Sequence, residues 1–282
     1  MNPMLIIARL TFREAVRRRI ALAALLLGLA FLILYSLGFH FINLEMTRAE
    51  GVGSAPNAVA RREIYNFMTM AGLYAVTFLS VAMGALVSAD TLAGEIGSGA
   101  IQSIVTKPVR RAEVVFGKWL GFAGLLALYL LLMAGGVAGS VWVQARYAPP
   151  NFLRGVGLIY LESLLIMSIT LMCSSLISTL ATGGVVFGLY GLAFIGGWVE
   201  QIGSFLGNQT AVNIGILSSL IIPSEALWKR AAFEMQSPLV SAVGFSPFSA
   251  RSIPSPFMIV YAAGYALAAL VLAMRWFSRR DL

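Results

Sequence analysis

Cysteine, histidine and charged residues are all scarce in this chain. Among 282 residues there is one cysteine, Cys173, and one histidine, His40, and 11% are charged, against about a quarter in soluble domains. A single cysteine excludes an internal disulfide, and these counts exclude a metal site built from His and Cys clusters. We therefore expect no metal bound by this chain. So little charge cannot cover the molecule with polar surface, so lipid must cover much of it.

Hydrophobic residues make up 59% of the chain and gather in long runs. A membrane-spanning helix needs about 20 consecutive apolar residues. The runs predict an all-α integral membrane protein that forms a single transmembrane domain over residues 1–282. We expect six transmembrane helices, at about residues 20–41, 66–89, 118–145, 157–178, 184–204 and 257–276. Glycine pairs at Gly117–Gly121 and Gly135–Gly139 allow close helix approach.

Two charge-free stretches do not each correspond to one simple spanning helix. Ser163–Val199 is free of charge and longer than one span needs, so we place a turn within Ser178–Gly184, where small and polar residues gather. Ile202–Ser224 is also free of charge, but its polar residues and the closing Pro223 favour a re-entrant or interfacial segment over a seventh span. It begins a semi-polar outer segment between spans five and six.

The basic residues indicate how the chain is oriented. A net charge of +8 would suggest nucleic acid in a soluble protein, but here Lys and Arg cluster at the ends of the apolar runs. This pattern is typical of contact with anionic lipid headgroups, so we expect membrane lipid and no nucleic acid as a partner. With six spans, the larger share of the 20 Lys and Arg falls on the side of the termini. The positive-inside rule then predicts a multi-pass protein of the cell (inner) membrane with both termini cytoplasmic.

The first residues predict an amphipathic helix at 4–19 that lies in the membrane interface. Phe12 belongs to its apolar face, while Arg9, Arg13 and Arg17 recur every four residues on another face.

The loop between spans two and three is the longest predicted cytoplasmic loop. A short amphipathic stretch at 100–106 ends at Lys107 and Pro108, and the next helix begins with Arg111 and Glu113. A short helix held off the membrane can pass motion from a soluble partner to both spans, although spacing alone favours an ordinary connecting loop. The candidate coupling residues are Asp90, Glu95, Gly97, Gly99, Lys107, Pro108, Arg111 and Glu113.

The order of these residues resembles a known family. An acidic residue with a Gly-rich break, a short apolar helix, Lys-Pro-Val-x-Arg and Glu–apolar–apolar–x–Gly-Lys follow one another within residues 95–118. This order resembles the six-span permease subunits of ABC-type exporters, the class with separate ATPase subunits. The class includes drug and polysaccharide exporters and the permease that serves nitrous oxide reductase maturation. The basic amino-terminal helix is similar to its elbow helix, and Phe277–Leu282 is similar to its usual carboxy-terminal end.

The resemblance implies a partnership and a mechanism. Two permease chains, in a homodimer, would form the translocation path and assemble with two ABC ATPase subunits. A coupling helix in the loop between spans two and three would dock into the ATPase and switch the spans. ATP and Mg²⁺ would be bound by the ATPase, so we expect no cofactor on this chain and no enzymatic activity of its own. No G-x-x-x-x-G-K-[ST] motif occurs in the sequence.

One acidic residue is a candidate for the translocation path itself. Glu162 stands near the outer end of span four between apolar residues, where a carboxylate is costly and often functional. A carboxylate that reaches the interface, or that pairs with Arg154, fits the sequence equally well.

Two other functions remain as alternatives. An ion-coupled secondary carrier needs ionisable groups deep in its spans, and a lipid-modifying membrane enzyme needs convergent acid, base or nucleophilic groups. Both kinds of group are scarce in this chain, which places the ABC permease first.

Overall fold

In the computed structural model, residues 3–51, 58–97, 110–236 and 253–279 are described, and all regular structure within them is helical. The helices are α1 (Pro3–Arg17), α2 (Arg19–Gly51), α3 (Ala58–Gly97), α5 (Arg111–Ala145), α6 (Phe152–Ser174), α7 (Thr179–Leu206), α8 (Gln209–Ile221), α9 (Ser224–Met235) and α11 (Phe257–Arg279). The predicted all-α membrane fold is confirmed.

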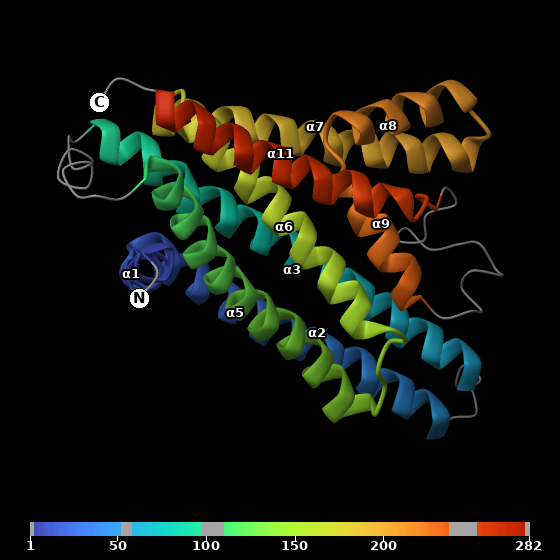
Figure 1. Cartoon of the computed structure of the whole chain (residues 1–282). Coiled ribbons are helices and arrows are strands. Elements are labelled where there is room, and N and C mark those ends of the chain that lie inside the picture. Colours follow the sequence, from blue (N-terminus) through green and yellow to red (C-terminus); the bar gives the residue numbers. More distant parts are fainter. Residues whose placement is uncertain (1–2, 52–57, 98–109, 237–252, 280–282) are drawn as a thin grey trace.

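Six of these helices are long and apolar enough to cross a membrane, as predicted: α2, α3, α5, α6, α7 and α11. Figure 1 shows N and C at the same end of the bundle, and the end of α3 and the start of α5 lie at that end too.

The core forms where α3, α5 and α6 pack together. Leu73 of α3, Met133 of α5 and Ile166 of α6 are fully buried or nearly so. The α2 helix is different, because only 11% of its most apolar window is buried inside the chain. Most of its apolar surface is therefore left for lipid or for another chain.

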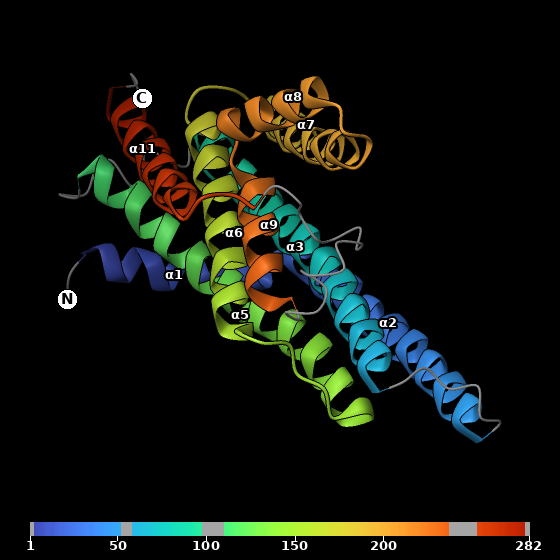
Figure 2. The same ribbon diagram turned by 90° about the vertical axis from the view of Figure 1, so that its right-hand side faces the viewer.

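The amino-terminal helix packs across the beginning of α5, as Figure 2 shows. A Cβ added at Gly117 would meet Ile7, and one at Gly121 would meet the carbonyl oxygen of Ala8. The predicted close approach at this glycine pair is thus made by α1. At Gly135 and Gly139 a Cβ would meet nothing within 4 Å among the described residues.

The turn between the fourth and fifth spans differs from the prediction. It occupies Ser175–Ser178, since α6 ends at Ser174 and α7 already begins at Thr179. Gly183 and Gly184 lie within α7, where an added Cβ would meet nothing within 4 Å. They are open positions on a helix surface, and the turn ahead of them consists of Ser175, Leu176, Ile177 and Ser178.

The α8 and α9 helices form a hairpin that is bent by 106° at Ile222 and Pro223. The α8 helix runs antiparallel to α7, because Gly203 faces Ala211 and Gly196 faces Ser218. The α9 helix then returns beside α6, and Figure 1 shows both helices on the side of the bundle away from the termini.

The end of this hairpin is tied to α3 and to the start of α6. The side-chain amide of Asn66 donates to the carbonyl oxygen of Met235 at 3.0 Å, and that of Asn151 donates to the carbonyl oxygen of Glu234 at 3.2 Å. The chain therefore enters and leaves the hairpin at the same end of the molecule, as the predicted re-entrant segment would.

Candidate functional site

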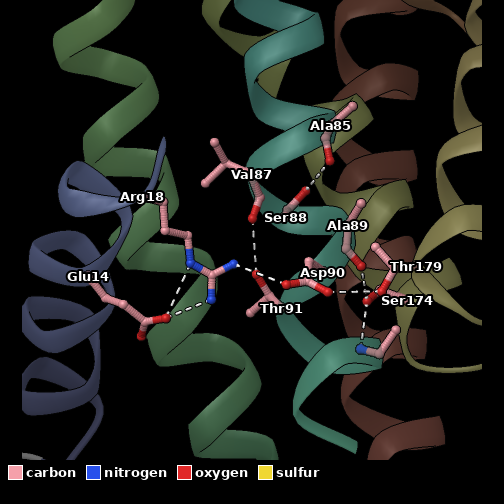
Figure 3. A network of polar contacts seen from close by, with 11 residues as sticks. Glu14, Arg18, Ala85, Val87, Ser88, Ala89, Asp90, Thr91, Ser174 and Thr179 are labelled. Carbon is pink, nitrogen blue, oxygen red and sulfur yellow. Dashed lines mark hydrogen bonds and ion pairs between the residues drawn. The ribbon is translucent and has the colours of Figure 1, made fainter. Parts of the chain in front are cut away.

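A network of polar side chains joins four helices at the end of the molecule that carries the termini, close to the loop between α3 and α5. We call it the Asp90 network; its members are Glu14, Arg18, Asp90, Ser174 and Thr179, drawn in Figure 3. Asp90 is at its centre: Arg18 Nη1 lies 3.6 Å from Asp90 Oδ2, and the Thr179 hydroxyl donates to Asp90 Oδ1 at 3.0 Å. Glu14 holds the other side of the guanidinium, with 2.6 Å between Glu14 Oε1 and Arg18 Nη2.

The positions of these residues make Asp90 a junction. Arg18 stands in the break between α1 and α2, and Thr179 is the first residue of α7. Asp90 itself lies on α3, two turns of helix before that helix ends at Gly97. One carboxylate therefore connects α3 to the α1–α2 joint and to the start of α7. The Arg18 and Asp90 side chains are 24% and 48% exposed, so water weakens their ion pair and its value for stability is small.

Ser174 adds a link from α6 to the same part of α3. Its hydroxyl donates to the carbonyl oxygen of Ala89 at 2.7 Å and accepts from the N–H of Ala93 at 3.0 Å. A regular α-helix would pair those two backbone groups with each other. The Ser174 hydroxyl therefore bridges two backbone groups of one turn of α3, directly beside Asp90.

The predicted coupling residues are divided by what the structure describes. Gly99, Lys107 and Pro108, with the predicted coupling helix, lie outside the described residues, as does the side chain of Glu95. Gly97 is the last residue of α3.

The remaining coupling residues beyond Asp90 open α5. Arg111 is its first residue, and Glu113 caps it by accepting the N–H of Arg110 at 3.3 Å. The structure thus joins Asp90 to other helices and gives Glu113 a local role at a helix start.

The predicted elbow residues lie on α1. Arg9, Arg13 and Arg17 are exposed, as are the apolar side chains of Leu5 and Leu10. Phe12 packs against the core and faces Gly124 of α5. Exposed arginines beside exposed leucines are the arrangement expected of a helix at a membrane interface.

A second polar site is enclosed between α6, α7 and α9. We call it the carboxylate cluster; it consists of Glu162, Glu200, Glu225 and Lys229. All four are buried, and Lys229 Nζ lies 2.7 Å from Glu200 Oε2. Among the described residues, no three His, Cys, Asp or Glu are arranged to hold a metal ion.

Glu162 is the least satisfied member of the carboxylate cluster. It is 1% exposed, and its Oε2 has no hydrogen-bond partner among the described residues. Glu225 is the charged side chain close enough to repel it, whereas Arg154 is exposed on the outer part of α6. The Glu162 carboxyl is therefore enclosed within the protein and does not reach its surface.

Glu225 is positioned by the hairpin bend. Pro223 ends the bend, Glu225 falls in the first turn of α9, and Gly197 of α7 leaves the space that the Glu225 side chain fills. The Tyr74 hydroxyl of α3 hydrogen-bonds to Glu225, and the Tyr74 ring packs on Trp228 with 4.8 Å between ring centroids. A carboxylate at a helix amino terminus also gains from the helix dipole.

Sequence reasoning missed Glu225 and Lys229 as site residues, and it also missed Glu200. The signal for the first two was their spacing, since residues four apart on a helix share one face. This spacing could not indicate a site by itself, because the site forms only where the hairpin packs that helix face against α6 and α7.

A groove of about 540 Å³ lies between α2, α3 and α7, next to the carboxylate cluster. Tyr74 connects the two, because it lines the groove while its hydroxyl contacts Glu225. The rest of the lining is apolar or aromatic.

Comparison with protein families agrees with this architecture. Residues 5–282 match the family described as ABC-2 family transporter protein, which is nearly the whole chain. Comparison with individually curated proteins gives no match. The chain therefore belongs to the ABC-2 transporter family, whose members are the membrane-spanning permease components of ABC transporters.

Proposed function

We propose that this chain is the permease of an ATP-driven exporter of the inner membrane, in which two copies form the translocation path and each pairs with one ATPase subunit. The Asp90 network is the observation that carries this proposal, because it ties three spans and the elbow helix together beside the predicted coupling loop. In this assembly ATP and Mg²⁺ are bound by the ATPase, and both termini face the cytoplasm.

The Asp90 network supports a mechanical role for the loop. A displacement of the end of α3 moves Asp90, and Asp90 pulls on Arg18 at the base of α2 and on Thr179 at the base of α7. The α2, α3 and α7 helices are also the three that enclose the groove. A push from the ATPase on the loop would therefore change the width of the groove, which is how such a permease would alternate its access.

Glu162 belongs in this proposal as a residue near the path. It has no ion-pair partner among the described residues, yet it acts electrostatically on Tyr74 and Tyr190, which line the groove. A buried ionisable group inside a membrane domain is a functional candidate by default.

The test is reconstitution with the ATPase. The chain should co-purify with an ABC ATPase encoded beside it, in equal numbers of copies, and inverted vesicles should accumulate substrate only when ATP is supplied. Transport by the chain alone, without any ATPase, would overturn the proposal.

The carboxylate cluster keeps one alternative open, an ion-coupled carrier, because its buried carboxylates are the groups that such a carrier needs. Uptake driven by a pH gradient in ATP-free vesicles, abolished by Glu162→Gln, would favour the carrier. No uptake under these conditions favours the permease.

A further inference from the structure

The walls of the groove combine aliphatic side chains with aromatic rings. Five rings line it: Phe31 of α2, Tyr74 and Phe78 of α3, and Tyr190 and Phe194 of α7. Tyr74 lies 6.1 Å from Phe194 between ring centroids, and Phe78 lies 6.2 Å from Tyr190. The faces of aromatic rings carry negative partial charge and attract cations. The volume of about 540 Å³ is that of a pocket for a small organic molecule.

Two buried acidic side chains lie near two of these rings. Glu162 and Glu225 both act electrostatically on Tyr74 and on Tyr190. Tyr74 also hydrogen-bonds to Glu225. Tyr74 and Tyr190 both line the groove, so the two carboxyl groups, when ionised, attract a cation in it through an apolar interior where water screens the interaction little.

The carboxylate cluster holds more acidic than basic side chains. It contains three carboxyl groups and one ammonium group, and the ammonium of Lys229 is already paired with Glu200 at 2.7 Å. Glu162 Oε2 has no partner among the described residues. Burying a carboxylate without a counter-charge costs free energy. A cation in the neighbouring groove would supply a counter-charge that no described side chain provides to Glu162.

From this geometry we propose that the groove binds lipophilic organic cations and that these are the substrate class of the transporter. That these cations are transported as substrates rests on the proposed function, whereas their binding in the groove does not. The aromatic and aliphatic walls receive the apolar body of the ligand, and the ring faces of Tyr74 and Tyr190 receive its positive charge. Glu162 and Glu225, which lie near these rings, select for that charge.

Competing occupants fit the same walls less well. A lipophilic anion matches the apolar lining but is repelled by both carboxylates. A lipid acyl chain fills the space but draws nothing from the carboxylate cluster, so its binding would be indifferent to Glu162.

Two ions of the same shape and opposite charge test the proposal, tetraphenylphosphonium and tetraphenylborate. Binding of each is measured by equilibrium dialysis to the full chain in phosphatidylcholine nanodiscs without ATP, with protein-free nanodiscs as background. We expect saturable binding of the phosphonium ion and no binding of the borate above background. Equal binding of both ions would overturn the proposal, since it would identify a groove for any apolar molecule.

Single substitutions distinguish the contribution of the buried charge to binding from the contribution of the space in the groove. Glu162→Gln keeps the shape of the side chain and should weaken phosphonium binding about tenfold, which corresponds to about 1.4 kcal/mol. Ala75→Trp fills the groove without touching the carboxylates and should abolish binding. Glu45→Gln, at an exposed position on α2, is the matched control and should change nothing. If the Glu162→Gln variant unfolds at the wild-type temperature and binds the phosphonium ion with unchanged affinity, the role of the carboxylate is overturned.

The outcomes distinguish this inference from the proposed function. ATP-driven transport of other compounds, with no phosphonium binding, would overturn the substrate class and leave the permease intact. Phosphonium binding by a chain that never assembles with an ATPase would overturn the permease and leave the binding site intact.

Discussion

Lys229 and Glu200 form an ion pair that is closed off from solvent, with 2.7 Å between Nζ and Oε2 and each side chain 6% exposed. The pair joins α9 to α7, so it holds the re-entrant hairpin against a spanning helix. The other arm of the hairpin, α8, also packs closely on α7. Gly196 and Gly215 allow this approach, because a Cβ at Gly215 would meet the carbonyl oxygen of Gly196.

Breaking one half of this pair should destabilise the protein strongly. Lys229→Met leaves Glu200 as an uncompensated buried charge, and Glu200→Gln does the same to Lys229, so each should lower the free energy of unfolding by about 3–5 kcal/mol. The double variant should lose much less than the sum. The measurement is unfolding in detergent, analysed as a double-mutant cycle. Additive losses would show that the two side chains do not act as a pair.

Glu162→Gln should have the opposite effect on stability. Glu162 is 1% exposed and its Oε2 lacks a partner among the described residues, so removing its charge relieves a burial penalty. We expect the free energy of unfolding to be unchanged or higher by about 1 kcal/mol, with impaired transport. A large loss of stability would mean that Glu162 is held by a partner that the described residues do not show.

Asp90→Asn tests the Asp90 network. The amide that replaces the carboxylate can still accept from the Thr179 hydroxyl, but it loses the ion pair with Arg18. Since the pair is partly exposed, stability should fall by less than about 1 kcal/mol. ATP hydrolysis by the complex should continue while the amount of substrate moved per ATP falls severalfold. Glu45→Gln breaks an exposed ion pair with Arg48 on α2 and serves as the control; a wild-type transport ratio in Asp90→Asn would contradict the coupling role.

Two glycines of α5 should respond to alanine with opposite signs. At Gly135 an added Cβ meets nothing within 4 Å among the described residues, so alanine should stabilise the helix by about 1 kcal/mol. At Gly121 the Cβ would stand 2.7 Å from the carbonyl oxygen of Ala8, so alanine should push α1 away and destabilise by about 1–3 kcal/mol. Thermal unfolding of the two variants side by side measures the difference. A shift of the same sign in both would show that α1 does not rest on Gly121.

Local composition was sufficient for the membrane class and the number of spans. Apolar runs such as the one that became α2 can satisfy their backbone groups in lipid only as helices, so their length alone predicts a crossing. The proline at position 223 likewise marked where the outer segment could not continue as one helix. The position of the turn between α6 and α7 was harder to predict from the sequence. Gly183 and Gly184 are residue types typical of turns, but in the structure they lie on an open surface of α7.

The partners of the polar residues depended on tertiary structure. Asp90 was recognised as an acidic residue before a loop, but Arg18 and Thr179 are 72 and 89 positions away in the chain, and nothing local indicates that they meet. Glu162, Glu200, Glu225 and Lys229 are isolated charges in the sequence that become one cluster only through the re-entrant hairpin. The hydrophobic pattern acts over a few turns of helix and is readable from the sequence. The pairing of charges depends on which helix faces meet across the bundle, and only the packed fold decides that.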